Sequence, residues 1–212
     1  MYGFFWKRLF DILFALLAMP FWLVLLVIVG PILYLQDRGS VFYSAPRLGK
    51  NGKVFTMFKF RTMRMNAPDI RNGDGSTYNA ADDPRVTPFG RFLRRTSLDE
   101  TPQLLNILAG DMSFIGPRPD LPEHIACYSD FEHRKLEIRP GVTGFSQAYF
   151  RNSVQWKERI RNDIYYIDHL SFLFDIKILI KTVFSVLRCE GVYEIHEKQS
   201  GKTGKGMQEV TR

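Results

Sequence analysis

The chain has 212 residues, 45% of them hydrophobic, and its 29 lysines and arginines outnumber 22 aspartates and glutamates to give a net charge of +7. This length and apolar content support one domain with an ordinary core, and the basic excess favours anionic partners. Cys127 and Cys189 form no CxxC pair, and the four histidines lack zinc-ligand spacing. Both facts argue against a disulfide framework or a zinc site.

The first feature along the chain is an apolar run from Ile12 to Leu35 that contains no charged residue. At about 1.5 Å per residue, roughly 36 Å of helix is enough to cross a bilayer core. Pro20 removes a backbone hydrogen bond and predicts a kink or break. Length and composition favour a kinked spanning helix. The basic residues at both ends favour a helix that enters the membrane and returns, because positive charges prefer the cytoplasmic side.

A β-hairpin is predicted next, because residues 41–43 and 53–63 have extended character and Asn51-Gly52 between them is a strong turn signal. Alternation along the second strand places Lys59 and Arg61 on one face. The opposite, apolar face would then carry Val54, Thr56, Phe58 and Phe60. Two cations on a strand face are commonly solvated; directed at one site, they would clamp a phosphate. The polar residues 66–83 are predicted to form a loop, with a mobile lid as one use of it.

The adjacent carboxylates Asp99 and Glu100 follow a cluster of arginines. The cluster consists of Arg85, Arg91, Arg94 and Arg95. Ser97 and Glu100 have the spacing of a capping box, which predicts that a helix begins here and that both acids serve its first turn. Gly110 is predicted to end this helix.

Apolar residues recur at helical spacing from Ile176 to Leu187 and predict an amphipathic helix, with Lys177 and Lys181 on its other side. A helix that faces the core and a helix that lies among lipid headgroups both fit this pattern. The polar residues 193–212 are predicted to form a disordered tail.

The cations around the acid pair indicate a role beyond capping. Arg118 is framed by prolines in Gly116–Pro119, so its guanidinium loses little entropy when it binds phosphate oxygens. Arg139 opens a further turn, Arg-Pro-Gly-Val-Thr-Gly. Carboxylates among cations suit a Mg²⁺-bound diphosphate, because Mg²⁺ is typically held by one or two carboxylates plus substrate phosphates.

Five long motifs carry a resemblance to a known family. They are residues 59–63, 91–100, 102–108, 110–119 and 139–144. In this order they resemble the bacterial sugar transferase family, the monotopic phosphoglycosyl transferases, and the resemblance extends from about Trp6 to about Val192. It implies transfer of a sugar 1-phosphate from a UDP-sugar to a polyprenyl phosphate, through a covalent aspartyl-phosphosugar, with release of UMP. It also implies a re-entrant helix broken at Pro20, although Met19 stands where the family usually has serine.

The resemblance also implies roles for single residues. Asp99 would be the nucleophile and Glu100 the Mg²⁺ ligand. Lys59, Arg94 and Arg118 occupy positions associated with phosphate or nucleotide contacts. The remaining expected substrate-binding residues are Arg61, Arg139, Asp163 and Asp175.

The expected architecture is therefore an α/β, mostly α, single compact domain with a β-hairpin, a Pro-broken re-entrant helix and interfacial amphipathic helices. Residues 1–36 would form the membrane helix and anchor, 37–192 the catalytic domain at the cytoplasmic face of the bacterial inner membrane, and 193–212 the tail. Expected partners are UDP-sugar, polyprenyl phosphate and membrane lipid, a homo-oligomer and downstream glycosyltransferases, with no nucleic acid. The alternative is a non-catalytic, membrane-tethered basic scaffold that binds anionic lipid.

Overall fold

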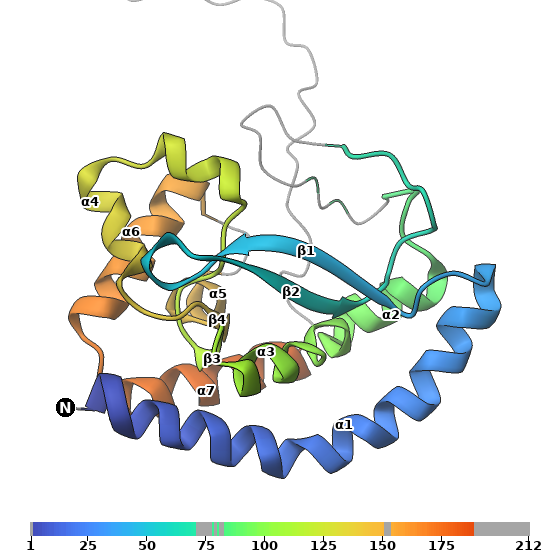
Figure 1. Ribbon diagram of the computed structural model, residues 1–212, viewed down its shortest axis with the longest axis horizontal. Helices are drawn as coiled ribbons and strands as arrows, with labels where there is room; N and C mark the ends of the chain where they lie inside the picture. The colour runs from blue at the N-terminus through green and yellow to red at the C-terminus, as the bar shows by residue number, and fades with distance from the viewer. Residues whose placement is uncertain (1, 71–77, 79, 81–82, 151–153, 189–212) are drawn as a thin grey trace, which may run out of the picture.

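The computed structural model describes the chain except residues 1, 71–77, 79, 81–82, 151–153 and 189–212. Figure 1 shows a β-hairpin across the middle of the molecule, helices around it and a long N-terminal helix along one side. The hairpin pairs β1 (Phe42–Leu48) with β2 (Val54–Phe60), and the short strands β3 (Ser113–Ile115) and β4 (Gly141–Thr143) form a parallel pair. The predicted tail and part of the predicted 66–83 loop fall outside the described residues.

The other elements are helices and single helical turns. The helices are α1 (Lys7–Asp37), α2 (Pro88–Thr96), α3 (Gln103–Ala109), α4 (Asp130–His133), α5 (Phe145–Tyr149), α6 (Trp156–Asp168) and α7 (Phe172–Leu187). A π-helical turn (Tyr2–Trp6) leads into α1, and 3₁₀ turns occupy Lys50–Gly52, Leu98–Glu100, Pro122–Cys127 and Arg134–Glu137. This confirms the predicted mostly helical single domain with a β-hairpin.

The hairpin is confirmed, but burial along its second strand is not confined to the predicted apolar face. Asn51 and Gly52 make the turn with positive φ angles of 57° and 74°. On the predicted apolar face, Phe60 is 1% exposed but Val54 is 50% exposed, and Phe55 and Met57 on the other face are buried. The reason lies in the tertiary structure: α1 and α3 cover the Phe55 side and pack against it in one apolar cluster. Single-strand alternation cannot show which face a distant helix will cover.

The apolar run forms one continuous helix, α1, which contains both Pro20 and Pro31. Figure 1 shows that α1 is bent and that both its ends turn toward the rest of the domain. A proline inside a helix removes a hydrogen bond and accounts for such a bend. One stripe of α1, including Trp22 and Leu33, is buried against the domain, while Phe21 is 79% exposed. The helix is long and apolar enough to cross a membrane.

Ion pairs fasten each end of α1 to the domain. At its start, Lys7 Nζ lies 2.6 Å from Asp175 of α7, with both side chains largely buried. At its end, Arg61 donates from Nη2 to Asp37 Oδ1 (2.6 Å) and to the Leu33 carbonyl (2.9 Å). Arg61 directly follows β2. The two ends of α1 therefore bind the same folded unit.

Removing Lys7 tests the first of these attachments. We expect Lys7→Met to lower the free energy of unfolding by about 3–5 kcal/mol, because it leaves the Asp175 carboxylate buried without its cation. The double variant Lys7→Met/Asp175→Asn should recover part of this loss, since the uncompensated charge is gone. Thermal denaturation in detergent measures both, and equal destabilisation in the single and double variants would contradict the prediction.

The predicted amphipathic helix is confirmed as α7, which begins where the Ser171 hydroxyl accepts a hydrogen bond from the Phe174 backbone N–H. Ile178, on the inner side of this helix, is fully buried. Much of its apolar surface is nevertheless exposed, and Leu173 and Leu187 are 71% and 74% exposed. The core therefore uses only part of the apolar side of α7.

Candidate active site

The acid pair lies in a single 3₁₀ turn, Leu98–Glu100, between α2 and α3. The predicted capping box is wrong. Ser97 closes α2 in the left-handed region (φ 57°) with its backbone N–H on the carbonyls of Leu93 and Arg94, and α3 begins only at Gln103. The Glu100 carboxylate binds Lys59 instead of returning to Ser97. The ion pair with Lys59 of β2 thus replaces the predicted contact between Glu100 and Ser97. A capping box does occur at Ser129 and Glu132, at the start of α4.

Asn106 of α3 positions β2 beside the acid pair. Its side-chain oxygen accepts a hydrogen bond from the Phe58 N–H (3.0 Å), and its amide donates to the Thr56 carbonyl (2.7 Å). The side chain is buried and takes the place of a neighbouring strand for this part of β2. As a result Lys59, the residue after Phe58, is held against the Leu98–Glu100 turn.

Three of the predicted cations gather around the two carboxylates. Lys59 Nζ lies 2.6 Å and Arg118 Nη1 3.8 Å from Glu100 Oε1. Arg94 lies on α2, donates from Nε to the Thr62 hydroxyl (2.9 Å) and acts electrostatically on Asp99. The structure therefore brings together Lys59, Arg94, Arg118, Asp99 and Glu100, which come from four segments of the chain.

The two carboxylates differ electrostatically although they are neighbours. Burial raises the pKa of Asp99 to about 6, with Glu100 adding to the rise and Lys59 opposing it. Burial also disfavours the ionised form of Glu100, but the nearby Lys59 and Arg118 outweigh it and lower the pKa of that carboxyl. Glu100 is thus the firmly anionic partner, and Asp99 is largely ionised at neutral pH.

Three other expected residues lie elsewhere and have structural partners. Arg61 holds the end of α1, and Asp175 accepts hydrogen bonds from Lys7 and Tyr166. Arg139 donates from Nε to the carbonyl of Gly110 (2.7 Å), at the end of α3. Each side chain instead binds an oppositely charged group or a free carbonyl at the end of a helix, and these contacts hold it away from the acid pair.

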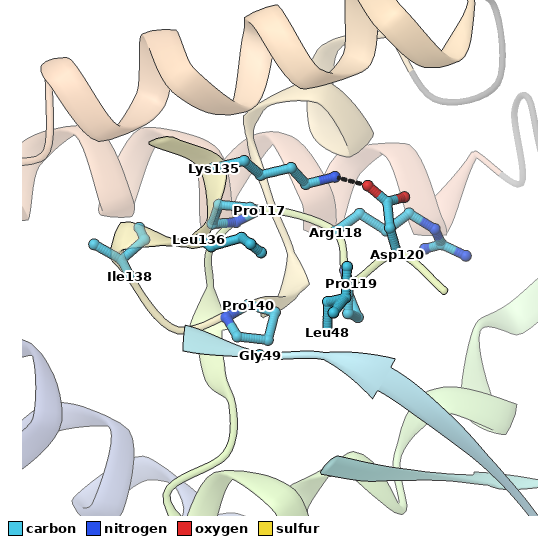
Figure 2. Close-up of a pocket in the computed structure, with 10 residues that line it drawn as sticks. All are labelled: Leu48, Gly49, Pro117, Arg118, Pro119, Asp120, Lys135, Leu136, Ile138 and Pro140. Atoms are coloured by element: carbon cyan, nitrogen blue, oxygen red, sulfur yellow. Dashed lines mark hydrogen bonds and ion pairs between the residues drawn. The ribbon is translucent and has the colours of Figure 1, made fainter. Parts of the chain in front are cut away.

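Asp163 lies in a buried cluster beneath the Gly116–Pro119 loop. Lys135 Nζ is 2.5 Å from Asp120 and 3.2 Å from Asp163. Asp120 also accepts a hydrogen bond from the Tyr128 hydroxyl (2.6 Å). Figure 2 shows Lys135 paired with Asp120 beside a small pocket, and Arg118 two residues before that aspartate. This cluster fixes the loop that carries Arg118.

The pKa of Asp163 gives a stability prediction. Burial raises this pKa to about 6, against the opposing charge of Lys135. Between about pH 4 and 6 the folded protein thus binds more protons at Asp163 than the unfolded chain does, so this group makes stability fall as pH rises. We expect wild type to lose stability relative to Asp163→Asn over this window, with no further change above about pH 7. Melting curves in detergent at each pH measure the difference, and a pH-independent difference would contradict the assignment.

Close backbone contact also fixes the Gly116–Pro119 loop, which carries Arg118. A Cβ on Gly141 would lie 2.1 Å from the backbone nitrogen of Gly116, so only glycine permits the pairing of β3 with β4 at this point. The Arg139–Gly144 motif therefore supports the Arg118 loop from behind.

Sequence reasoning missed Lys135 and Asp120 as parts of this arrangement. A single lysine among charged neighbours at 132–135 carries no signal of burial. Only the folded structure shows that its side chain is 2% exposed between two carboxylates.

The donor set fits Mg²⁺ in one way only. Within the described part of the chain, no three His, Cys, Asp or Glu side chains could hold a metal by themselves. Glu100 could do so together with the phosphates of a substrate, as Mg²⁺ sites commonly do. Because the contacts with Lys59 and Arg118 are both made to Oε1 of Glu100, the other oxygen, Oε2, is the one that could bind the metal.

The fold and the site thus combine paired carboxylates with three basic side chains from separate segments of the chain. The chain belongs to the bacterial sugar transferase family, whose model matches residues 2–189.

Several named proteins are similar to this chain in sequence. An uncharacterized sugar transferase of Bacillus subtilis, EpsL, is 38% identical over 94% of this chain and 96% of its own length. An undecaprenyl-phosphate galactose phosphotransferase of Salmonella typhimurium is 37% identical over 89% of this chain and 42% of its own length. A UDP-glucose:undecaprenyl-phosphate glucose-1-phosphate transferase of Xanthomonas campestris is 38% identical over 88% of this chain and 40% of its own length.

Proposed function

We propose that this protein transfers a sugar 1-phosphate from a UDP-sugar to a polyprenyl phosphate and releases UMP, as a membrane step of glycoconjugate synthesis. The observation that carries the proposal is the Asp99–Glu100 pair enclosed by Lys59, Arg94 and Arg118. The names of the Salmonella and Xanthomonas relatives, which specify undecaprenyl phosphate and a galactose or glucose phosphate, support this choice of substrates.

In the first step an oxygen of the Asp99 carboxylate attacks the β-phosphorus of the donor. The bond from this phosphorus to the bridging oxygen breaks, and UMP leaves with the electron pair. The ionised Asp99 needs no base to remove a proton, because the carboxylate is already the nucleophile. Lys59, Arg94 and Arg118 stabilise the negative charge on the transferring phosphoryl group.

In the second step an oxygen of the polyprenyl phosphate attacks the same phosphorus. The aspartyl–phosphate bond breaks, which regenerates the Asp99 carboxylate and gives the polyprenyl diphosphate sugar. Mg²⁺, held by Glu100 and the substrate phosphates, would supply further neutralisation of phosphate charge.

For the membrane segment we propose the re-entrant arrangement, with both ends of α1 and the catalytic domain at the cytoplasmic face. The support is that Lys7 and Asp37, at opposite ends of α1, both pair with the same domain. A spanning helix would separate these ends by the bilayer thickness. The exposed apolar side chains of α7, including Leu173 and Leu187, would then rest in the interface.

The function is tested by incubating purified protein with polyprenyl phosphate, Mg²⁺ and a panel of UDP-sugars. We expect UMP release with at least one donor, and the panel includes UDP-galactose and UDP-glucose because two relatives are named for these sugars. If no donor yields UMP and the protein binds only anionic lipid vesicles, the non-catalytic scaffold is the better explanation.

The topology is tested by cysteine labelling in a background without Cys127 and Cys189. Phe5→Cys reports the start of α1, since Phe5 is 65% exposed, and Lys53→Cys reports the exposed hairpin turn of the catalytic domain. We expect a membrane-impermeant reagent to label neither cysteine from the periplasm and both after the membrane is opened. Periplasmic labelling at position 5 alone would support a spanning helix.

A further inference from the structure

Arg47 lies beside the candidate active site but has no part in the motifs that define it. It is the second-last residue of β1, where Tyr43 pairs with Lys59 and Arg47 with Phe55. Because side chains alternate along a strand, Arg47 projects from the same face of the hairpin as Lys59. The next residue, Leu48, donates its backbone N–H to the Asp120 carbonyl (2.9 Å). The end of β1 is therefore fastened to the loop that carries Arg118.

Within the described part of the chain, no salt bridge joins the Arg47 guanidinium to a carboxylate, although Asp120 and Glu123 act on it at longer range. Its hydrogen bond there runs from Nη1 to the carbonyl of Pro46 (2.8 Å). The nearby Asp120 carboxylate already accepts hydrogen bonds from Lys135 and Tyr128. Burial and the neighbouring charge of Arg118 lower the pKa of Arg47 and outweigh the opposing effects of Tyr43, Asp120 and Glu123. A half-buried guanidinium beside a second cation is unfavourable unless an anion binds there.

Arg118 connects the acid pair with Arg47. Its Nη1 lies 3.8 Å from Glu100 Oε1, and its charge also acts on Arg47. Lys59 and Arg118 are the cations that act on Glu100, and Arg47 is not among them. Figure 2 shows the Arg118 side chain extending past Asp120, away from the apolar side chains that line the pocket. The order in space is therefore the acid pair, then Arg118, then Arg47.

We propose that Arg47 forms, beside Arg118, a second phosphate subsite, which holds the donor phosphate that Asp99 does not attack. This inference rests on the function proposed above. Two adjacent guanidinium groups match the two linked phosphates of a nucleoside diphosphate, because each planar fork can bind a phosphate through two oxygens. The phosphate at Arg47 departs with the nucleoside and gains negative charge as the bridging bond breaks. Arg47 would thus stabilise the leaving group, while Lys59, Arg94 and Arg118 act on the phosphate that is transferred.

The test combines direct binding with steady-state kinetics. Equilibrium dialysis measures the affinity of full-length protein for UDP and UMP, which needs no turnover. The variants are Arg47→Met, which removes the charge, and Arg47→Lys, which keeps the charge but loses the fork. The matched control is Lys53→Met, which removes one positive charge from an exposed position on the same hairpin.

We expect Arg47→Met to weaken UDP and UMP binding and to raise KM for the UDP-sugar at least about tenfold, with KM for polyprenyl phosphate within about twofold of wild type. Arg47→Lys should recover only part of the loss, and Lys53→Met should change neither nucleotide binding nor KM for the UDP-sugar. Unchanged nucleotide binding in Arg47→Met, or an equal loss in Lys53→Met, would overturn the subsite. A rise confined to KM for polyprenyl phosphate would overturn its assignment to the donor. Failure of the proposed function is distinct, since it appears as absent UMP release in wild type.

Discussion

Asp99→Asn is expected to reduce UMP release by at least ~1,000-fold, the scale of loss seen when an enzyme loses its nucleophile. The amide keeps the shape of the side chain but cannot attack phosphorus as a carboxylate does. With labelled UDP-sugar and no acceptor, wild-type protein should become covalently labelled in proportion to the UMP released, and Asp99→Asn should not. Burst-phase UMP release and the label on denatured protein measure the same step independently.

The control for this variant is Asp130→Asn, which makes the same chemical change at an exposed aspartate in the first turn of α4. It should retain wild-type labelling and turnover. Labelling of Asp99→Asn at the wild-type level would eliminate Asp99 as the nucleophile, and the neighbouring Glu100 would then become the candidate.

Glu100→Gln is the second large effect we expect. Loss of metal-assisted charge neutralisation should lower turnover by roughly 100- to 1,000-fold, and the Mg²⁺ concentration for half-maximal rate should rise at least about tenfold. The reason is that a neutral amide oxygen binds a hard cation more weakly than a carboxylate does. UMP release measured across a Mg²⁺ titration gives both quantities.

Two controls separate metal binding from the ion pair with Lys59. Lys59→Met breaks the same 2.6 Å contact but leaves the Glu100 carboxylate, so its Mg²⁺ requirement should stay near that of wild type even if turnover falls. Glu158→Gln changes an exposed glutamate of α6 and should alter neither quantity. An unchanged Mg²⁺ titration in Glu100→Gln would exclude Glu100 as the metal ligand.

The helix α1 illustrates which structural properties can be predicted from the sequence and which cannot. The uncharged run of residues 12–35 predicted a helix long enough to cross a bilayer, and α1 extends beyond this run at both ends. Pro20 predicted its distortion, because both features are local properties of the chain. Whether its ends lie together depends on ion pairs such as Lys7–Asp175, which join residues far apart in the sequence. Nothing in the local pattern around either residue identifies the other as its partner.

The sequence by itself determined the family, the hairpin, the amphipathic helix α7 and the identity of the central residues Asp99, Glu100, Lys59, Arg94 and Arg118. Their roles as nucleophile, metal ligand and phosphate-binding groups stay predictions. The tertiary structure alone decided that the acid pair lies in a turn between helices rather than at a capped helix start. It also decided that Arg61 and Asp175 hold elements together, and that Lys135 is buried beneath the Arg118 loop. The physical reason is that local patterns record backbone preference, whereas the partner of a charged side chain is chosen by whichever opposite charge the fold brings within reach.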